Sequence, residues 1–160
     1  MPEGDTLEKI ARYLRARLIG KTIVTGRMRP DSGQLLAGER INAVQAHGKH
    51  LFIRFRSGWG VRTHLGMTGS WHRYSRSEKW QRPVTQASLI LQFTDAIYVC
   101  FNAKEVQALT DGGIHERSLL RRLGPDLSEE NCDLSTIVSR VRHQDGASPV
   151  IDILLDQSVA

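Results

Sequence analysis

The middle of the chain alternates apolar and polar residues with a period of two, in short runs separated by turn-forming residues. Such alternation places every second side chain on the same face of a strand. Turn signals such as Asp31-Ser32-Gly33, His47-Gly48 and Ser57-Gly58 separate the runs. Eight short strands at this spacing are typical of an antiparallel sandwich or barrel. We predict the strands at Lys21–Arg29, Glu39–Ala46, Lys49–Arg56, Gly60–Leu65, Ser70–Tyr74, Ser88–Phe93, Ala96–Cys100 and Glu105–Leu109.

Helical patterns flank this region on both sides. Before it, residues 5–19 carry leucine and isoleucine at steps of three or four, with Gly20 as a natural stop. After it, residues 110–117 form a predicted linker, followed by a short turn at Leu119–Leu123 and two helices. The first of these helices is marked by Leu134, Ile137, Val138 and Val141, and the second covers Val150–Leu155 after Ser148-Pro149.

The predicted fold class is therefore mainly β with α. An N-terminal helix packs on an eight-strand antiparallel β-sandwich, and a partial helical segment follows. We expect two domains, residues 1–112 and 113–160. The polar stretch Ser75–Gln86 is expected to be a long exposed hairpin loop between two strands.

Composition limits the classes of partner and compartment. The net charge is +5, and 17 of the 22 cations are arginine, which suits a phosphate surface but also follows from an arginine-rich codon bias. Cys100 and Cys132 lie far apart with no CxxC motif, which excludes a disulfide framework or a self-contained cysteine zinc site and fits a reducing cytoplasm. No apolar run is long enough for a membrane span, and the acidic start lacks a signal core.

The first candidate site is Pro2-Glu3 at the start of the chain. With Met1 removed, Pro2 presents a secondary amine, and about a tenth of such amines are neutral at pH 7. Attack on a sugar C1′ gives an iminium with no N–H to lose, which is an electron sink for β-elimination. Glu3 can supply general acid or base catalysis. The alternative is that both residues merely precede a helix.

Two further candidates lie in turns. Lys49 is one of five lysines and stands at a predicted hairpin tip, where it can reach a phosphate or simply be solvated. Met67 lies between Gly66 and Gly69, which allow a sharp turn that pushes an apolar wedge into a base stack. The alternative is that Met67 fills a gap in the core. The histidines do not predict a metal site, because no acid or cysteine completes a ligand set at familiar spacing.

Several of these segments together resemble the formamidopyrimidine-DNA glycosylase/endonuclease VIII family, in its order and at about its spacing. The opening is similar to the endonuclease VIII-like branch of actinobacteria. The matching segments are Met1–Thr6, Gly48–Leu51, His64–Trp71, Leu123–Leu127 and Leu154–Gln157.

The resemblance implies a base-excision-repair enzyme with DNA glycosylase and AP-lyase activities. Pro2 would be the nucleophile, Glu3 the proton shuttle and Lys49 a catalytic contact to the phosphate near the lesion. Met67 would fill the void left by the flipped base. Arg62 and His64 complete the expected set of DNA-binding residues.

The resemblance also implies a helix–two-turn–helix after the sandwich, and damaged double-stranded DNA as the partner. The expected localisation is the cytoplasm, at the bacterial nucleoid, and the expected state is a monomer, with association through an exposed helical tail as an alternative.

The chain departs from the family pattern in three places. It ends before the expected Gly-Ile-Gly-Asn segment and the C-terminal zinc finger, so it resembles an N-terminal fragment, and we expect no cofactor in this chain. Phe101–Glu105 stands where the 8-oxoguanine-directed branch has two more wedge residues, which favours oxidised pyrimidines as substrates. Asp5-Thr6 replaces the usual Pro-Glu. The alternative function is a truncated, catalytically inactive DNA-binding fragment.

Overall fold

The computed structural model describes residues 4–29, 31, 35–110 and 134–143 of the chain. It divides the chain into two compact units, residues 1–113 and 114–160. The expected domain boundary between residues 112 and 113 lies outside the described residues and stays a prediction.

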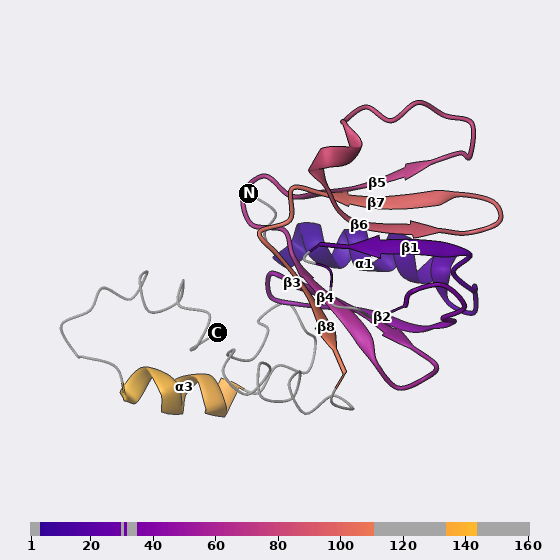
Figure 1. Ribbon diagram of the computed structural model, residues 1–160. Coiled ribbons are helices and arrows are strands. Elements are labelled where there is room, and N and C mark those ends of the chain that lie inside the picture. The colour runs from indigo at the N-terminus through magenta and orange to yellow at the C-terminus, as the bar shows by residue number, and fades with distance from the viewer. Residues whose placement is uncertain (1–3, 30, 32–34, 111–133, 144–160) are drawn as a thin grey trace. The chain divides into compact units, whose positions relative to one another are not determined.

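Two four-stranded antiparallel sheets form the first unit (Figure 1). The first sheet has the strand order β1-β6-β7-β5 and the second sheet the order β2-β3-β4-β8. This arrangement confirms the predicted antiparallel sandwich. The strands are β1 (Thr25–Met28), β2 (Ile41–His47), β3 (His50–Phe55), β4 (Gly60–His64), β5 (Ser70–Tyr74), β6 (Ala87–Gln92), β7 (Ile97–Phe101) and β8 (Glu105–Leu109).

Strand positions agree with the sequence prediction to within two residues, except at the start of β1. The predicted first strand began at Lys21, whereas β1 begins at Thr25. Residues ahead of it follow a different path, since Thr22 makes only an isolated bridge to Arg40, next to the second sheet. The alternation there reflects contacts with both layers rather than one continuous strand.

The hairpin predicted at Ser75–Gln86 is wrong. Strand β5 pairs with β7 and not with β6, so this segment crosses from one strand to a non-adjacent one. It is largely exposed, as expected, and ends in a short 3₁₀ helix, Val84–Gln86. The ring of Trp80 holds it to the sheet by stacking on Tyr74, with centroids 5.7 Å apart, and by an edge contact with Phe101. These rings form an aromatic cluster separate from the main core.

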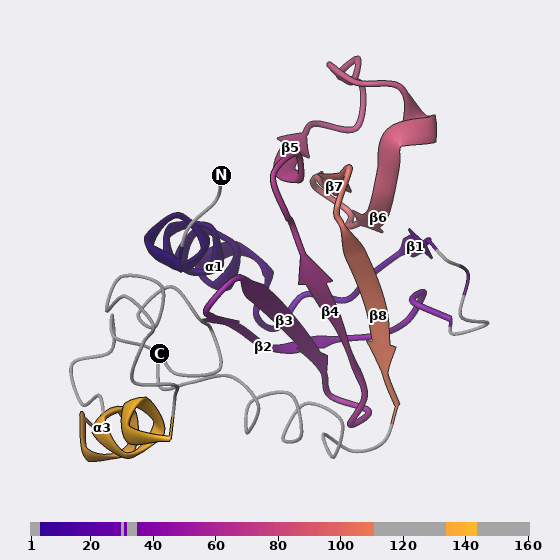
Figure 2. The ribbon, with the colours of Figure 1, turned by 90° about the vertical axis from the view of Figure 1, so that its left-hand side faces the viewer.

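Helix α1 (Gly4–Leu18) packs on the second sheet, against β2 and β3. Figure 2 views it down its axis, at one side of the two sheets. Its buried positions recur at steps of three or four, so they share one face of the helix. That face enters the core between the sheets, with exposed fractions of 0–1% at Leu7, Ala11, Leu14 and Leu18.

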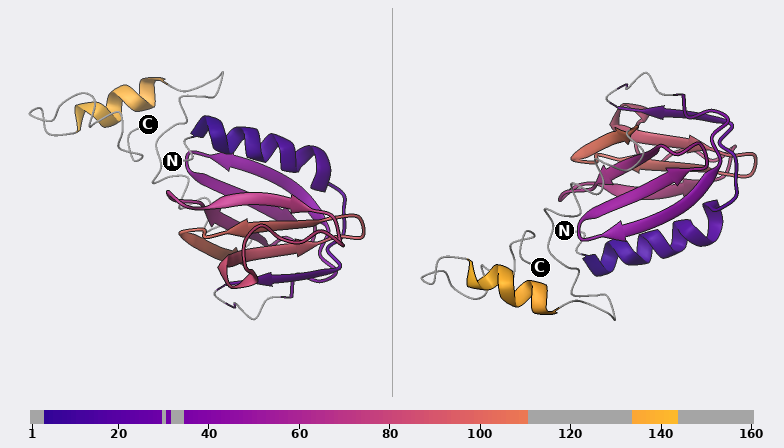
Figure 3. Two further views of the ribbon diagram at one scale, coloured as in Figure 1. Left: turned by 90° about the horizontal axis from the view of Figure 1, so that it is seen from above. Right: turned by 90° about the horizontal axis from the view of Figure 1, so that it is seen from below.

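Helix α1 runs opposite to β2, so its first turn lies near the end of that strand. Just after the helix, the Gly20 backbone N–H donates to the Ile41 carbonyl at the start of β2, and the side-chain Nε of Arg15 donates to the Val44 carbonyl. From Arg15 back to Gly4 the helix covers about 16 Å. From Val44 to His47 the strand covers about 10 Å. The helix therefore begins near the end of β2, and both views of Figure 3 draw its first turn at the same end of the sandwich as the ends of the neighbouring strands.

Within the second unit, the structure describes one helix, α3 (Leu134–Arg142), which confirms the helix predicted from its apolar spacing. Ile137 is its buried residue. The predicted turn at Leu119–Leu123 and helix at Val150–Leu155 lie outside the described residues. Across the described parts of the chain, no helix is both long and apolar enough to cross a membrane.

Candidate functional site

The strand register brings three loops together at one end of the sandwich. In the second sheet His47 pairs with His50, His50 with His64, and His64 with Glu105. The β2–β3 turn, the β4–β5 loop (residues 65–69) and the β7–β8 turn (residues 102–104) are therefore neighbours. We call this the Lys49 end. It holds Lys49 and Met67, and α1 begins beside it (Figure 3).

Lys49 occupies a two-residue turn between β2 and β3. Gly48 adopts a φ of +53°, which tight hairpin turns require and which glycine adopts without steric cost. The lysine is half-buried rather than fully solvated. The charge of Lys49 is one of the causes that lower the pKa of His64, which lies at the end of β4. The turn thus holds a cation close to the Met67 loop.

Met67 is 79% exposed, which excludes the alternative that it fills a gap in the core. Glycines on both sides shape its loop. A Cβ at Gly69 would clash with the backbone of Leu65, and Gly66 has a φ of +62° with the Lys104 side chain packed beside it. The loop therefore presents an apolar side chain to solvent on a tightly constrained backbone, as a wedge requires.

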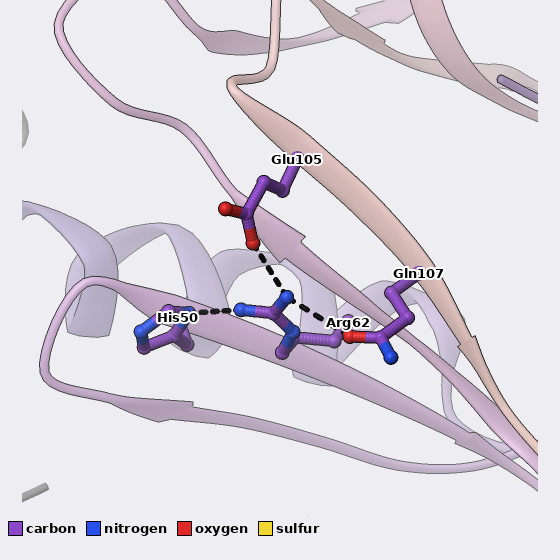
Figure 4. Close-up of polar contacts among 4 residues, drawn as sticks. All are labelled: His50, Arg62, Glu105 and Gln107. Atoms are coloured by element: carbon purple, nitrogen blue, oxygen red, sulfur yellow. Dashed lines mark hydrogen bonds and ion pairs between the residues drawn. The ribbon is translucent and has the colours of Figure 1, made fainter. Parts of the chain in front are cut away.

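Arg62 lies beneath the Lys49 end and is bonded within the protein (Figure 4). Its guanidinium donates to His50 Nδ1 at 2.9 Å, to Glu105 Oε2 at 2.6 Å and to Gln107 Oε1 at 3.0 Å. Only 7% of the side chain is exposed. The expected DNA contact of Arg62 stays a prediction, and this geometry favours a supporting role that ties β3, β4 and β8 together.

The hydrogen bond from Arg62 determines the tautomer of His50. A guanidinium only donates, so His50 Nδ1 must accept and the ring proton must sit on Nε2. Burial, and then the charge of Arg62, lower the pKa of His50 to about 4. The ring is therefore neutral at pH 7. Glu105 remains ionised, because the hydrogen bond from Arg62 lowers the pKa of its carboxyl group.

His64 is half-buried at the end of β4, immediately before the Met67 loop. Its ring lies 4.8 Å from that of His50. Burial, and then the charge of Lys104, lower its pKa, so this ring is also neutral at pH 7. A neutral ring can donate or accept one hydrogen bond, and its role as a DNA contact stays a prediction.

Sequence reasoning missed three residues of the Lys49 end: His50, Lys104 and Glu105. Lys104 is exposed on the β7–β8 turn, against the glycine that precedes Met67. The alternation of β8 gave part of the signal, because Glu105 and Gln107 stand two residues apart and so share one face of their strand. That Arg62 lies on the same face of the neighbouring strand follows only from the register.

The expected nucleophile and proton shuttle, Pro2 and Glu3, lie outside the described residues. Within the part of the chain that is described, no three histidine, cysteine or acidic side chains gather as metal ligands would. Cys100 is buried, and burial raises the pKa of its thiol, so it is not a reactive nucleophile.

Comparison with known proteins places these features in a family. Residues 1–106 match the family described as the formamidopyrimidine-DNA glycosylase N-terminal domain. The chain is 31% identical over 160 residues to "Probable endonuclease 8 2" of Streptomyces coelicolor, covering 98% of this chain and 57% of that protein. It is 32% identical over 169 residues to "Endonuclease 8 2" of Mycobacterium tuberculosis, covering 99% and 62%. The chain thus spans about three-fifths of the length of these relatives.

Solved structures share the fold. A MutM complex with DNA containing carbocyclic 8-oxo-G has a TM-score of 0.80 at 19% identity, covering 99% of this chain and 63% of that one. A Lactococcus lactis formamidopyrimidine-DNA glycosylase bound to DNA with an AP site also has a TM-score of 0.80, at 18% identity, covering 98% and 62%. With two-thirds of its length matched by the family and its sandwich matched by these structures, the chain belongs to the formamidopyrimidine-DNA glycosylase/endonuclease VIII family.

Proposed function

We propose that this protein is a DNA glycosylase and AP lyase of base-excision repair, acting on oxidised bases in double-stranded DNA. Family membership supports the reaction class, and the relatives' names support the endonuclease VIII-like branch. The basic charge of the chain suits a phosphate backbone.

One observation carries the proposal: the start of α1, Lys49 and the exposed Met67 converge on the same end of the sandwich. Pro2 precedes the first residue of α1 by two positions, and two residues of chain span at most about 7 Å. Covalent connectivity therefore limits how far the proposed nucleophile can lie from the first turn of α1.

The first chemical step is displacement of the damaged base. The lone pair of the Pro2 nitrogen attacks C1′, and the glycosidic C–N bond breaks as the base leaves with a proton that Glu3 can deliver. The Pro2 nitrogen then loses its N–H proton, and its lone pair forms the C1′=N bond as the C1′–O4′ bond breaks. The ring oxygen takes up a proton, and the product is an iminium between Pro2 and C1′. Because the nitrogen is secondary, this iminium keeps its positive charge.

The second step is β-elimination. The iminium acidifies the C2′ proton, and removal of that proton lets the C2′–H electron pair form a C1′=C2′ bond. The resulting enamine then expels the 3′-phosphate with its electron pair, which cuts the strand. In this proposal Lys49 stabilises the phosphate charge near the lesion, and Met67 fills the space of the everted base.

We further propose a preference for oxidised pyrimidines. The β7–β8 turn contributes the cation Lys104 beside the Met67 loop instead of additional apolar wedges. With a single apolar wedge, the base opposite the lesion makes fewer contacts with the protein than it would with a set of three wedges. Rates on matched duplexes that contain 5-hydroxyuracil or 8-oxoguanine test this preference directly.

Borohydride trapping tests the main proposal. Incubation with abasic-site DNA and borohydride reduces the iminium to a stable amine, so a protein–DNA adduct is expected on a denaturing gel. Two extra residues ahead of Pro2 place its nitrogen in a peptide bond, and this version should give no adduct. Lys49→Gln should reduce the yield, whereas Lys79→Gln, on the exposed crossing segment, should not. Duplex binding at low salt without any adduct would favour the catalytically inactive DNA-binding fragment instead.

A further inference from the structure

The hydrogen bonds of Arg62 run from β4 to both of its neighbouring strands, toward the Lys49 end. His64 is the last residue of β4, and it pairs with His50 on β3 and with Glu105 on β8. Arg62 stands two residues earlier, directly opposite Gln107. Its guanidinium therefore extends along β4 and bonds diagonally to the strand on each side (Figure 4). One side chain thus links three strands just below their loops.

Two of the acceptors adjoin the turns of the Lys49 end. His50 directly follows Lys49, and Glu105 directly follows Lys104. Lys104 in turn packs on the β4–β5 loop, because a Cβ at Gly66 would lie only 3.0 Å from its own Cβ. A guanidinium is planar, with N–H groups in fixed directions, so it sets the spacing of the groups that it bonds. The position of one turn is therefore coupled to that of the other.

Burial makes this geometry firm without making it a large source of stability. The side chain of Arg62 is 7% exposed, and its bonds form in surroundings of low dielectric constant, where hydrogen bonds are stronger than in water. The cost of removing a buried ion pair from water largely offsets its attraction. The side chain of Glu105 is 49% exposed, so it stays solvated if Arg62 is replaced. An apolar replacement of Arg62 therefore leaves no unpaired charge in the interior.

We propose that Arg62 is a positioning residue, which acts through His50 to hold Lys49 in one place at the Lys49 end. The inference rests on the proposed function, in which Lys49 stabilises phosphate charge near the lesion. A cation that is already in position stabilises a developing charge better than one that must first reorganise. A misplacement of about 1 Å can lower a rate by about 100-fold.

Nuclear magnetic resonance of the full chain tests the inference without DNA. The imidazole nitrogen signals distinguish the two neutral tautomers, and His50 should carry its proton on Nε2 alone. Arg62→Met removes the donors with little change in volume. In this variant His50 should become a mixture of tautomers, and the backbone amide signal of Lys49 should broaden or split. A Lys49 signal that stays single and sharp would overturn the inference.

Trapping kinetics separate positioning from binding. With saturating abasic-site DNA no base has to be everted, and Arg62→Met should form the borohydride adduct at least about tenfold more slowly per folded molecule. The dissociation constant for the same duplex, measured by fluorescence anisotropy, should change by less than about threefold, since several phosphates share the binding. Weaker binding with an unchanged rate at saturation would make Arg62 a direct DNA contact and overturn the inference.

A double variant tests whether Arg62 acts through Lys49. In the Lys49→Gln background, Arg62→Met should slow adduct formation by less than about twofold more, because the group that it positions is already gone. A further slowing of about tenfold would show that Arg62 acts independently of Lys49, which would contradict the inference.

Graded variants test the role of the fork. Arg62→Lys keeps the charge but not the planar pair of donors, and Glu105→Gln keeps an acceptor oxygen but not the charge. Both variants should react at rates between those of the unchanged chain and Arg62→Met. If Arg62→Met fails to fold, these two variants carry the kinetic test, and unchanged rates in both would overturn the inference.

Glu39→Gln is the matched control. Glu39 also accepts from two side chains, Trp59 at 2.9 Å and Ser57 at 2.6 Å, but it does so beside the β3–β4 turn at the opposite end of the sheet. This variant should form the adduct at the unchanged rate and keep a single Lys49 signal, and equal slowing would contradict the inference. An unchanged chain that gives no adduct would contradict the proposed function, while the His50 and Lys49 signals would still decide this inference.

Discussion

His50 makes the stability of the first unit sensitive to acid. Its pKa is about 4 in the folded protein, lowered first by burial, against about 6.5 in the unfolded chain. Between these two pH values the unfolded chain binds more protons than the folded protein. The contribution of His50 to the free energy of unfolding is therefore fully present above about pH 6.5 and is lost as the pH is lowered toward 4. We expect a loss of up to about 3 kcal/mol across this interval, measured by urea unfolding at pH 7.5, 6 and 5.

The variant His50→Gln isolates this effect. It removes the titrating group while its amide oxygen can still accept from Arg62. Its stability should fall less steeply between pH 6.5 and 4.5, although His64, whose pKa is also lowered by burial, continues to contribute. An unchanged pH dependence in this variant would contradict the assignment to His50.

Met67 and Met28 are the same residue type at opposite extremes of burial, with exposed fractions of 79% and 6%. Met67→Ala should leave the unfolding free energy within about 0.5 kcal/mol of the unchanged chain, since little surface is buried there. It should nevertheless lower the yield of the borohydride adduct on a duplex with a damaged base. Met28→Ala should cost about 2–5 kcal/mol and leave the yield per folded molecule intact. Thermal melts and trapping gels at equal folded concentration measure both quantities.

For single residues, the sequence predicted where a residue lies in a loop or strand better than it predicted which groups surround its side chain. The glycines around Met67 correctly indicated a constrained loop, because that requirement is local. The surroundings of Arg62 depend on which strands pair, and a lone cation in an alternating run is indistinguishable from a surface residue. Only the register shows that Glu105 and Gln107 face it across the β4–β8 pair.

Among the elements, the loop of residues 65–69 gives the sharpest prediction. Gly69→Ala introduces a Cβ that clashes with the Leu65 backbone, so the loop must move. We expect a loss of about 1–3 kcal/mol in stability and a larger loss of trapping than this instability explains.

Gly58→Ala is the control for that variant. Gly58 lies in the β3–β4 turn at the opposite end of the second sheet, with a φ of +102° and open space around it. Its substitution strains the backbone and should lower stability without changing the trapping yield of the folded protein. Equal trapping by the two variants would contradict a role for the loop.

The types of the helices and strands could be predicted from local sequence patterns, whereas the order in which the strands pair could not. Strand β6, for example, alternates buried and half-buried residues, a pattern that its own segment of sequence records. The crossing at Ser75–Gln86 depends on β7, which comes later in the chain and inserts between β5 and β6. Trp80, read as part of a polar loop, is the residue that packs the crossing segment onto the sheet.

The whole molecule should bind DNA mainly through phosphate contacts, given its net charge of +5. If four to six phosphates are contacted, the logarithm of the binding constant falls against the logarithm of salt with a slope of roughly −4 to −5. Fluorescence anisotropy with a labelled duplex between 50 and 200 mM salt measures this slope. A slope near zero would contradict a phosphate-dominated interface.

Convergence at the Lys49 end is a property of the whole molecule that the sequence indicated only through family resemblance. Lys49 and Met67 are separated in the chain by two strands, β3 and β4, and the antiparallel return of β4 along β3 makes their loops neighbours. The position of the α1 start depends likewise on the antiparallel course of the helix along β2.

The burial of α1 reverses the usual gradient of mobility along a polypeptide. Chain termini normally fray at little cost, because few contacts hold them. Here four residues within the first twenty have exposed fractions of 0–1%, so the helix can unwind only when the sandwich itself opens. Amide protons in the middle of this helix should then exchange with solvent as slowly as those of the central strands, so the reaction proposed beside its first turn would take place next to a well-anchored helix.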